Sequence, residues 1–297
     1  AVIWLFTAGQ AATDAGRAST RRLARFAAAA VGGYPLTFAL FYPGGPLGNP
    51  AALAVFGTLA LLGIVWMLGW ALRRSRGVYL GVARLAALGA LVNLTLGAVL
   101  GVLIEVQFAG LALPVGNVFA AHPGMMTAGY ILPAALALVE WRLASGIDGR
   151  RDRLGVLAVA LLVVAGWAAA LGLGTGLTVL LMVTTLCQIV AVALFAIRLA
   201  PRVMRVPWAA PTGARLAAAA AIAVLVDVAL TVALVAAIVP TDAPPPPRLL
   251  IALAHTEFVG MMTNAFFALL LLATRARRAA VWPWADHLLF WGLNVGW

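Results

Sequence analysis

Long apolar runs follow one another along this chain, and they restrict its fold more than any other feature. Eight runs of roughly 20 residues, the length of an α-helix that crosses a bilayer, are separated by short breaks rich in Arg, Pro or Gly. They cover residues 23–43, 51–72, 78–104, 116–141, 154–174, 176–199, 213–239 and 249–273. Lipid offers the backbone no hydrogen bonds, so each run must bond internally as a helix. The sequence therefore predicts an all-α polytopic transmembrane helix bundle.

The composition excludes a soluble domain with a charged surface, because 64% of the 297 residues are hydrophobic and 10% are charged. We expect one transmembrane domain over residues 1–297. A ninth run begins near Trp282 and is still apolar at Trp297, so a partial ninth helix is expected. Residues 1–6 resemble the end of another apolar segment, and we expect both termini to be truncated. The single Cys187 excludes a disulfide framework and a cysteine-based metal cage.

Arginine placement predicts the topology. The net charge of +11 would indicate nucleic acid binding in a soluble protein, but here every second loop is basic and nucleic acid is not an expected partner. The basic groups are Arg17, Arg21, Arg22 and Arg25; Arg73, Arg74 and Arg76; Arg142, Arg150, Arg151 and Arg153; Arg198, Arg202 and Arg205; and Arg275, Arg277 and Arg278. The intervening loops contain only Arg248. Basic loops face the cytoplasm, so the N-terminal side of the first helix is predicted cytoplasmic, in an inner or plasma membrane of prokaryotic type.

The two halves of the chain, residues 23–142 and 154–275, resemble each other. The third run begins with Ala-Arg-Leu-Ala-Ala at residues 83–87, and the seventh begins with the same five residues at 214–218. A histidine follows in each half, His122 and His255, and Gly-Met-Met-Thr occurs at 124–127 and again at 260–263. Four helices separate the copies, which predicts a parallel four-helix repeat.

The matched histidines are the main indication of chemistry. His122 and His255 each lie about six residues inside a predicted helix that enters from the outer side, so they share one depth. Intramembrane histidine is costly without a partner. Two neutral imidazoles at one level suit axial ligation of haem iron, either clamping one haem or each facing its own. The alternative is that each ring bonds to a neighbouring helix and fixes packing.

The surroundings of both histidines carry a family resemblance. His122 is followed by Met126 four residues later and Pro133 eleven residues later, which resembles the second helix of haem-copper oxidase subunit I. The stretch from Ala254 to Val259, with Met262 and Phe266, resembles the later His-x-His helix of that family. The tail Phe-Trp-Gly-Leu-Asn-Val-Gly at 290–296 is similar to the next helix of nitric oxide reductase-like members.

The departures from the family restrict what the resemblance implies. Glu257 stands where the family has its second histidine, and no histidine lies between His122 and His255, so the copper site is absent. The resemblance implies a degenerate member that binds b-type haem through His122 and His255 and transfers electrons beside a redox partner subunit, without reducing oxygen. Met126 and Met262 are further candidate ligands, although methionine on an apolar face more often packs. Whether the chain is an oxidoreductase subunit stays open.

Two buried acids support a different function. Asp227 lies in the middle of the seventh predicted helix, with Asn93 as its approximate counterpart in the third, and Glu257 follows His255 by two residues. Charge at such depth is expensive and marks proton or ion pathways. The alternative functions are therefore a haem-free proton- or cation-coupled transporter, or a scaffold subunit of a membrane complex. Glu105 is expected to be an interface residue at the outer end of its helix.

Overall fold

The computed structural model describes residues 5–6, 14–77, 80–113, 116–144, 152–210, 212–238, 246–278 and 284–295. Throughout this part of the chain the regular structure is helical. The helices in the order of the chain are α2 (Asp14–Phe41), α3 (Pro50–Ser75), α4 (Val82–Phe108), α5 (Val118–Gly124), η1 (Met125–Ile131), α6 (Leu132–Leu143), α7 (Arg153–Thr175), α8 (Thr178–Val203), α9 (Gly213–Ile238), α10 (Pro247–His255), η2 (Thr256–Thr263), α11 (Asn264–Arg278) and α12 (Ala285–Val295). The segments α5–η1–α6 and α10–η2–α11 are each continuous.

The predicted helix bundle is confirmed. Within the described residues, 8 helices are long and apolar enough to cross a membrane, and they coincide with the eight predicted runs. The first run differs most, because α2 begins at Asp14 rather than at residue 23. Its additional turns carry the Arg-rich segment, which is helical without being apolar. The predicted start of the ninth helix at Trp282 lies outside the described residues, and α12 follows from Ala285.

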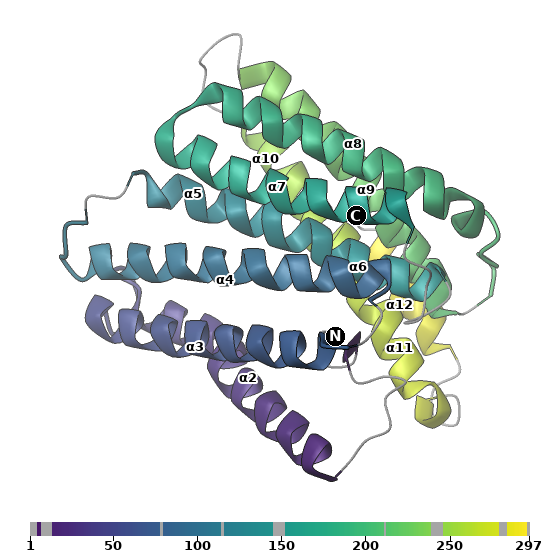
Figure 1. Cartoon of the computed structure of the whole chain (residues 1–297), viewed down its shortest axis with the longest axis horizontal. Coiled ribbons are helices and arrows are strands. Elements are labelled where there is room, and N and C mark those ends of the chain that lie inside the picture. Colours follow the sequence, from purple (N-terminus) through teal and green to yellow (C-terminus); the bar gives the residue numbers. More distant parts are fainter. Residues whose placement is uncertain are drawn as a thin grey trace.

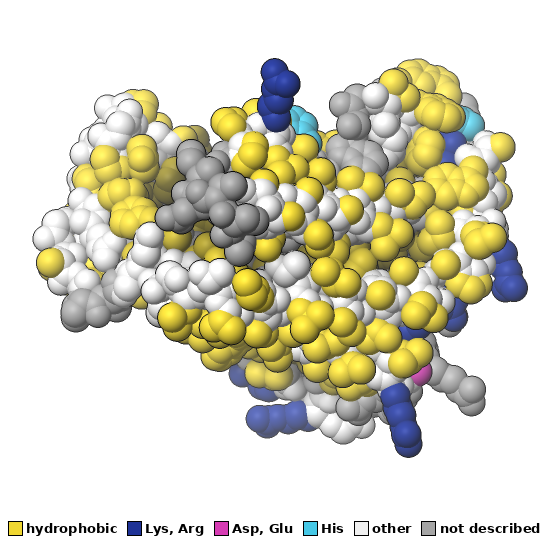
Figure 2. All heavy atoms as spheres, turned by 90° about the horizontal axis from the view of Figure 1, so that it is seen from above, with side chains coloured by type: hydrophobic (Ala, Val, Ile, Leu, Met, Phe, Trp, Pro, Cys, Tyr) yellow, Lys and Arg dark blue, Asp and Glu magenta, His cyan; other side chains and the backbone are white. Residues whose placement is uncertain are grey.

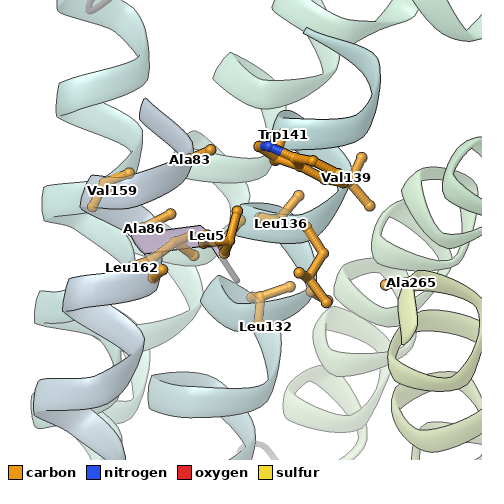
Figure 3. Close-up of a cluster of buried hydrophobic side chains, with 14 of the residues drawn as sticks. Leu5, Ala83, Ala86, Leu132, Leu136, Val139, Trp141, Val159, Leu162 and Ala265 are labelled. Carbon is orange, nitrogen blue, oxygen red and sulfur yellow. The ribbon is translucent and has the colours of Figure 1, made fainter. Parts of the chain in front are cut away.

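The core lies around the segment α5–η1–α6. In the span of residues 118–143, 78% of the most apolar 18-residue window is buried, whereas in the span of residues 17–41 only 6% of that window is buried. The former span is therefore central and α2 is peripheral. Figure 1 shows α2 at the edge of the bundle, inclined to α3. Side chains from α4, α6, α7 and α11 meet in the core, and Leu5 joins them (Figure 3). Many are alanines, which let neighbouring helices approach closely.

The outer surface is apolar, as lipid contact requires. Figure 2 shows hydrophobic side chains covering most of one face, with arginines at the margins. Large apolar side chains are exposed along most of the long helices, including Val55 on α3, Leu171 on α7, Leu186 on α8 and Ile251 on α10. Exposed apolar patches of this extent are unusual in soluble monomers. The structure is therefore that of an integral membrane protein.

The arginine of each Ala-Arg-Leu-Ala-Ala motif is buried and contacts a segment that is distant in the sequence. Arg84 at the start of α4 is 4% exposed, and its Nε donates to the carbonyl oxygen of Leu5 at 3.2 Å. Arg215 at the start of α9 is 1% exposed, and its Nη2 donates to the carbonyl oxygen of Asp286 at 2.7 Å. The matched Ala-Arg-Leu-Ala-Ala motifs thus make the same type of contact in both halves.

Candidate functional site

The two buried acids lie on neighbouring elements at similar depth. Asp227 is eleven residues before the end of α9 at Ile238, and Glu257 is ten residues after the start of α10 at Pro247. At a rise of about 1.5 Å per residue, both lie about 15–16 Å from the same end of the bundle. The helices α9 and α10–η2 are antiparallel and in contact. The fold therefore brings Asp227 and Glu257 to one level.

The two carboxyl groups lie in an apolar environment without a counter-ion among the described residues. Asp227 is 4% exposed, and its Oδ1 atom is buried without a hydrogen-bond partner among the described residues. Glu257 is half-buried, and the charge that acts on it is that of Asp227. Neither carboxylate forms an ion pair with any residue that the structure describes. Two like charges without a counter-ion are strongly disfavoured at low dielectric, so the arrangement favours one shared proton over full ionisation.

Glu257 belongs to one of two π-helical segments, which occupy matching positions in the two halves. The segment η1 covers Met125–Ile131 and η2 covers Thr256–Thr263, so each overlaps a Gly-Met-Met-Thr motif and follows a histidine. A π-helical turn widens the helix and leaves backbone groups without their usual partners, and such turns are frequent at functional sites. The sequence repeat is therefore accompanied by a repeated backbone irregularity beside the candidate residues.

A proline and an asparagine explain how η1 is accommodated. In an α-helix the carbonyl of Gly129 would accept from the N–H of residue 133, but that residue is Pro133 and has no N–H. The side-chain amide of Asn93, fully buried on α4, donates to this carbonyl at 2.8 Å. Its Oδ1 accepts from Trp167 Nε1 at 3.0 Å. Asn93, the counterpart of Asp227 in the first half of the chain, therefore stabilises η1 through its side-chain amide.

A second buried asparagine stabilises η2. Asn264 is fully buried, and its Nδ2 donates to the carbonyl oxygens of Val259 and Gly260, each at 3.1 Å. Its Oδ1 accepts from Asn294 Nδ2 on α12 at 3.0 Å, and its own amide also donates to Asn294 Oδ1 at 3.1 Å. The pair connects α12 to the helix that carries Glu257. Sequence reasoning missed Asn264, although a lone amide directly after Gly-Met-Met-Thr is visible in the chain.

The two histidines have different surroundings. His122 is half-buried, and its Nδ1 lies 2.8 Å from the carbonyl oxygen of Gly97 on α4. The absence of a side chain at Gly101 gives the ring room, because a Cβ there would lie 3.2 Å from His122 Cε1. His255 is exposed, and its Nδ1 lies 2.9 Å from the carbonyl oxygen of Ile251 in its own helix. The described contacts of the two rings are thus with different helices, that of His122 with α4 and that of His255 within its own helix, and a haem clamped between them stays a prediction.

Each histidine taken alone keeps one feature that a ligand needs. A ring that donates from Nδ1 to a carbonyl leaves Nε2 deprotonated and able to bind a metal. Both His122 and His255 have such a carbonyl beside Nδ1. Among the described residues, groups of three or more His, Cys, Asp or Glu that could hold a metal ion are absent. Haem ligation by His122 and His255, with one haem or with two, therefore remains a prediction.

The two candidate methionines contribute to packing. Met126 is half-buried against the main core, close to Gly97, where a Cβ would lie 2.6 Å from its Sδ. Met262 is also half-buried, and it lines a small apolar cavity together with Tyr130 and Leu91. These contacts agree with the usual role of methionine in filling irregular space. Ligation by Met126 or Met262 remains a prediction.

A third acid is more deeply buried than the sequence indicated. Glu105 near the end of α4 is 2% exposed, and its Oε1 accepts a hydrogen bond from the Tyr34 hydroxyl on α2. Its Oε2 is buried without a hydrogen-bond partner in the described residues and lies directly against Gly57 of α3, where even a Cβ would collide with it. Glu105 therefore joins three helices. A glutamate inside an apolar run, facing a glycine of the preceding helix, was the available signal.

Comparison with known proteins gives no relative. No family model, no curated protein and no solved structure matches this chain.

Proposed function

We propose that this protein is a proton-coupled membrane transporter in which Asp227 and Glu257 bind and release the coupling proton. The observation that carries the proposal is the buried Asp227 carboxylate, whose Oδ1 has no hydrogen-bond partner among the described residues, while Glu257 lies at a similar depth on the adjacent helix. A structural acid normally has a donor or a cation beside it. An acid kept without either is suited to exchange a proton.

The difference in exposure between the two acids suggests a route. In the proposal the half-buried Glu257 receives the proton first, and the more deeply buried Asp227 receives it second. A proton that moves from Glu257 to Asp227 leaves the first oxygen charged and the second neutral. Because Glu257 lies on η2, the transfer places a negative charge on this segment. The π-helical backbone of η2 has an alternative α-helical register. Proton transfer at the pair could in this way alter the packing of η2 on α9.

A proton suits the pair better than a metal cation. Two carboxylates offer at most four oxygen atoms, and Ca²⁺ takes about six to eight oxygen ligands. The described residues contain no third acid, histidine or cysteine grouped with them. The pair can share one proton without any further ligand.

Reconstitution tests the proposal. The purified protein in proteoliposomes containing a pH-sensitive dye should acidify the lumen when an outside-acid gradient and a transported solute are supplied. Asp227→Asn and Glu257→Gln should abolish the signal while retaining size and polarity at both positions. Asp152→Asn is the matched control, because Asp152 is exposed at the N-cap of α7 and asparagine caps a helix equally well. Equal proton flux in Asp227→Asn and wild type would refute the proposal.

We further propose that the arginine-rich end of the bundle faces the cytoplasm of a prokaryotic-type inner or plasma membrane. The support is that the ends of α3, α6 and α8 and the starts of α4 and α7 carry arginine, so that every second connection between helices is basic. These arginines are Arg73, Arg84, Arg142, Arg153 and Arg202. In a Cys187→Ser background, a cysteine at position 205 should react with a membrane-impermeant maleimide only in inverted vesicles. Labelling in intact cells would reverse the orientation.

A second candidate function is b-type haem binding at His122 and His255 individually. The specific support is the carbonyl beside each Nδ1 atom, which leaves Nε2 available. A bound haem would supply one-electron transfer to a redox partner subunit. The purified protein should then show a reduced Soret band that loses about half its intensity in His122→Ala or in His255→Ala. A colourless protein that also lacks proton flux would leave the scaffold function.

A further inference from the structure

An apolar groove runs along the arginine-rich half of α8. It has a volume of about 130 Å³ and lies between α6, α8 and α9. Its lining is entirely apolar and includes Phe195, Ala196, Ala200 and Leu225. Leu225 is 47% exposed, and Ala200 is exposed as well, so the groove opens onto the outer surface of the bundle rather than into its core.

The dimensions of the groove match one leaflet of a bilayer. On α8 its lining extends from Val192 to Met204, twelve residues apart, which corresponds to about 18 Å of helix. One leaflet contributes about 15 Å of hydrocarbon. The groove thus has the length and the chemistry of a site for an acyl chain.

The end of the groove carries a positive charge that the acids of the described residues do not neutralise. Arg198 is compensated, because it forms ion pairs with Glu140 at 2.8 Å and Asp152 at 2.7 Å. Arg202, one turn later, donates from Nη1 to the Arg198 carbonyl at 3.2 Å and has further N–H groups. Arg205 is exposed beside Met204, the last residue of the groove lining. Arg202 and Arg205 therefore place positive charge at the end of the apolar groove.

An aromatic side chain supports this assignment of depth. Trp208 follows Arg205 by three residues and is 37% exposed. Exposed tryptophan is enriched where hydrocarbon meets headgroups. Along the chain the apolar groove is followed by the arginines and then by Trp208. A phospholipid has the matching order, since its acyl chain is followed by its phosphate at the membrane surface.

We propose that this groove binds an anionic phospholipid, with an acyl chain between α8 and α9 and the phosphate beside Arg202 and Arg205. The preference arises from charge, since basic pockets between transmembrane helices select anionic headgroups. The site is separate from the Asp227–Glu257 pair, and the proposal does not depend on proton transport.

Thermal unfolding in nanodiscs tests the site. Phosphatidylglycerol should raise the melting temperature of the wild type relative to phosphatidylcholine. The Arg202→Gln/Arg205→Gln variant should bind phosphatidylglycerol roughly tenfold to thirtyfold more weakly, as expected for two basic residues near a headgroup. Arg25→Gln is the matched control, because Arg25 is exposed on the peripheral helix α2.

A second pair of variants tests the groove itself. Ala200→Phe places a ring in the lining and should remove the stabilisation by phosphatidylglycerol, whereas Ala193→Phe, exposed on the same helix outside the lining, should not. An unchanged lipid preference in both Ala200→Phe and the double arginine variant would overturn the proposal. Equal stabilisation by inorganic phosphate would reduce the site to an anion site and also overturn it. A dimer that Ala200→Phe dissociates would assign the groove to a second copy instead.

Discussion

The amide of Asn93 occupies the hydrogen-bonding position that Pro133 leaves open, 2.8 Å from the carbonyl oxygen of Gly129. Proline inside a membrane helix is tolerated when a neighbouring helix satisfies the freed carbonyl. Here the neighbour is α4, and the side chain that performs this function is fully buried. The π-helical segment η1 and the packing of α4 on α6 are therefore parts of one arrangement.

This relationship predicts a thermodynamic coupling. Asn93→Ala should lower the free energy of unfolding by about 1–3 kcal/mol, because the Gly129 carbonyl is left buried without a donor. Pro133→Ala restores an N–H at residue 133, so the same Asn93→Ala change should cost less in that background. A double-mutant cycle by unfolding in mixed detergent micelles measures the difference. Equal costs in the two backgrounds would show that the carbonyl does not depend on Asn93.

The Arg198 ion pairs should differ in strength. Glu140 is nearly buried and receives two bonds from Arg198, at 2.8 and 2.9 Å, whereas the side chain of Asp152 is 44% exposed. Arg198→Gln should cost about 3–5 kcal/mol, because it leaves a buried carboxylate without a partner. Asp152→Asn should cost less than about 1 kcal/mol, as solvent-exposed pairs do. The double variant Arg198→Gln/Glu140→Gln should recover much of the loss in a thermal unfolding assay.

The contact between Gly57 and Glu105 predicts that two substitutions will have overlapping effects. A Cβ at position 57 would displace the Glu105 carboxylate and so break its hydrogen bond to Tyr34. Gly57→Ala and Tyr34→Phe should therefore each release α2, which is otherwise the least buried span. Limited proteolysis near α2 should increase in either variant and should not increase further in the double variant. Gly69→Ala on the same helix, where a Cβ would only make an ordinary van der Waals contact with Arg73 Nη1 at 3.9 Å, is the control.

Asp227 should reduce the stability of the protein. Its unsatisfied Oδ1 atom imposes a desolvation cost of about 1–3 kcal/mol. Asp227→Leu keeps the branched shape and the number of side-chain heavy atoms without a polar atom, so we expect a higher melting temperature together with complete loss of proton flux. Ala223→Leu, which enlarges another fully buried side chain of α9, should instead destabilise the protein. A lower melting temperature of Asp227→Leu in detergent would mean that the acid has a stabilising partner.

Much of the fold could be predicted because it depends on apolar length. The break between α7 and α8 was visible in the sequence because a glycine, Gly176, stands there. In the structure Gly176 adopts a φ of 75°, a conformation that glycine tolerates best. The matching depth of Asp227 and Glu257 was also accessible, since it follows from counting residues to the ends of two adjacent helices. The start of α2 was not, because Arg-rich helical turns do not differ in composition from a loop.

The orientation of the histidines could not be predicted from the sequence. Apolar residues surround the transmembrane helices on all sides, so periodicity does not tell which face packs inward. His255 lies on the same exposed side of its helix as Ile251, whereas His122 turns toward the glycines of α4. The π-helical segments were also hidden, because they depend on partners such as Asn93 that are distant in the sequence.

The contacts of Arg84 and Arg215 have a consequence for tolerance to mutation. Each guanidinium donates to a main-chain carbonyl, at Leu5 and at Asp286. Every amino acid carries that oxygen, so substitutions at the two recognised positions leave the acceptor in place. The two arginines can thus keep these contacts while the side chains at Leu5 and Asp286 change, which suits the four-helix repeat predicted from the sequence.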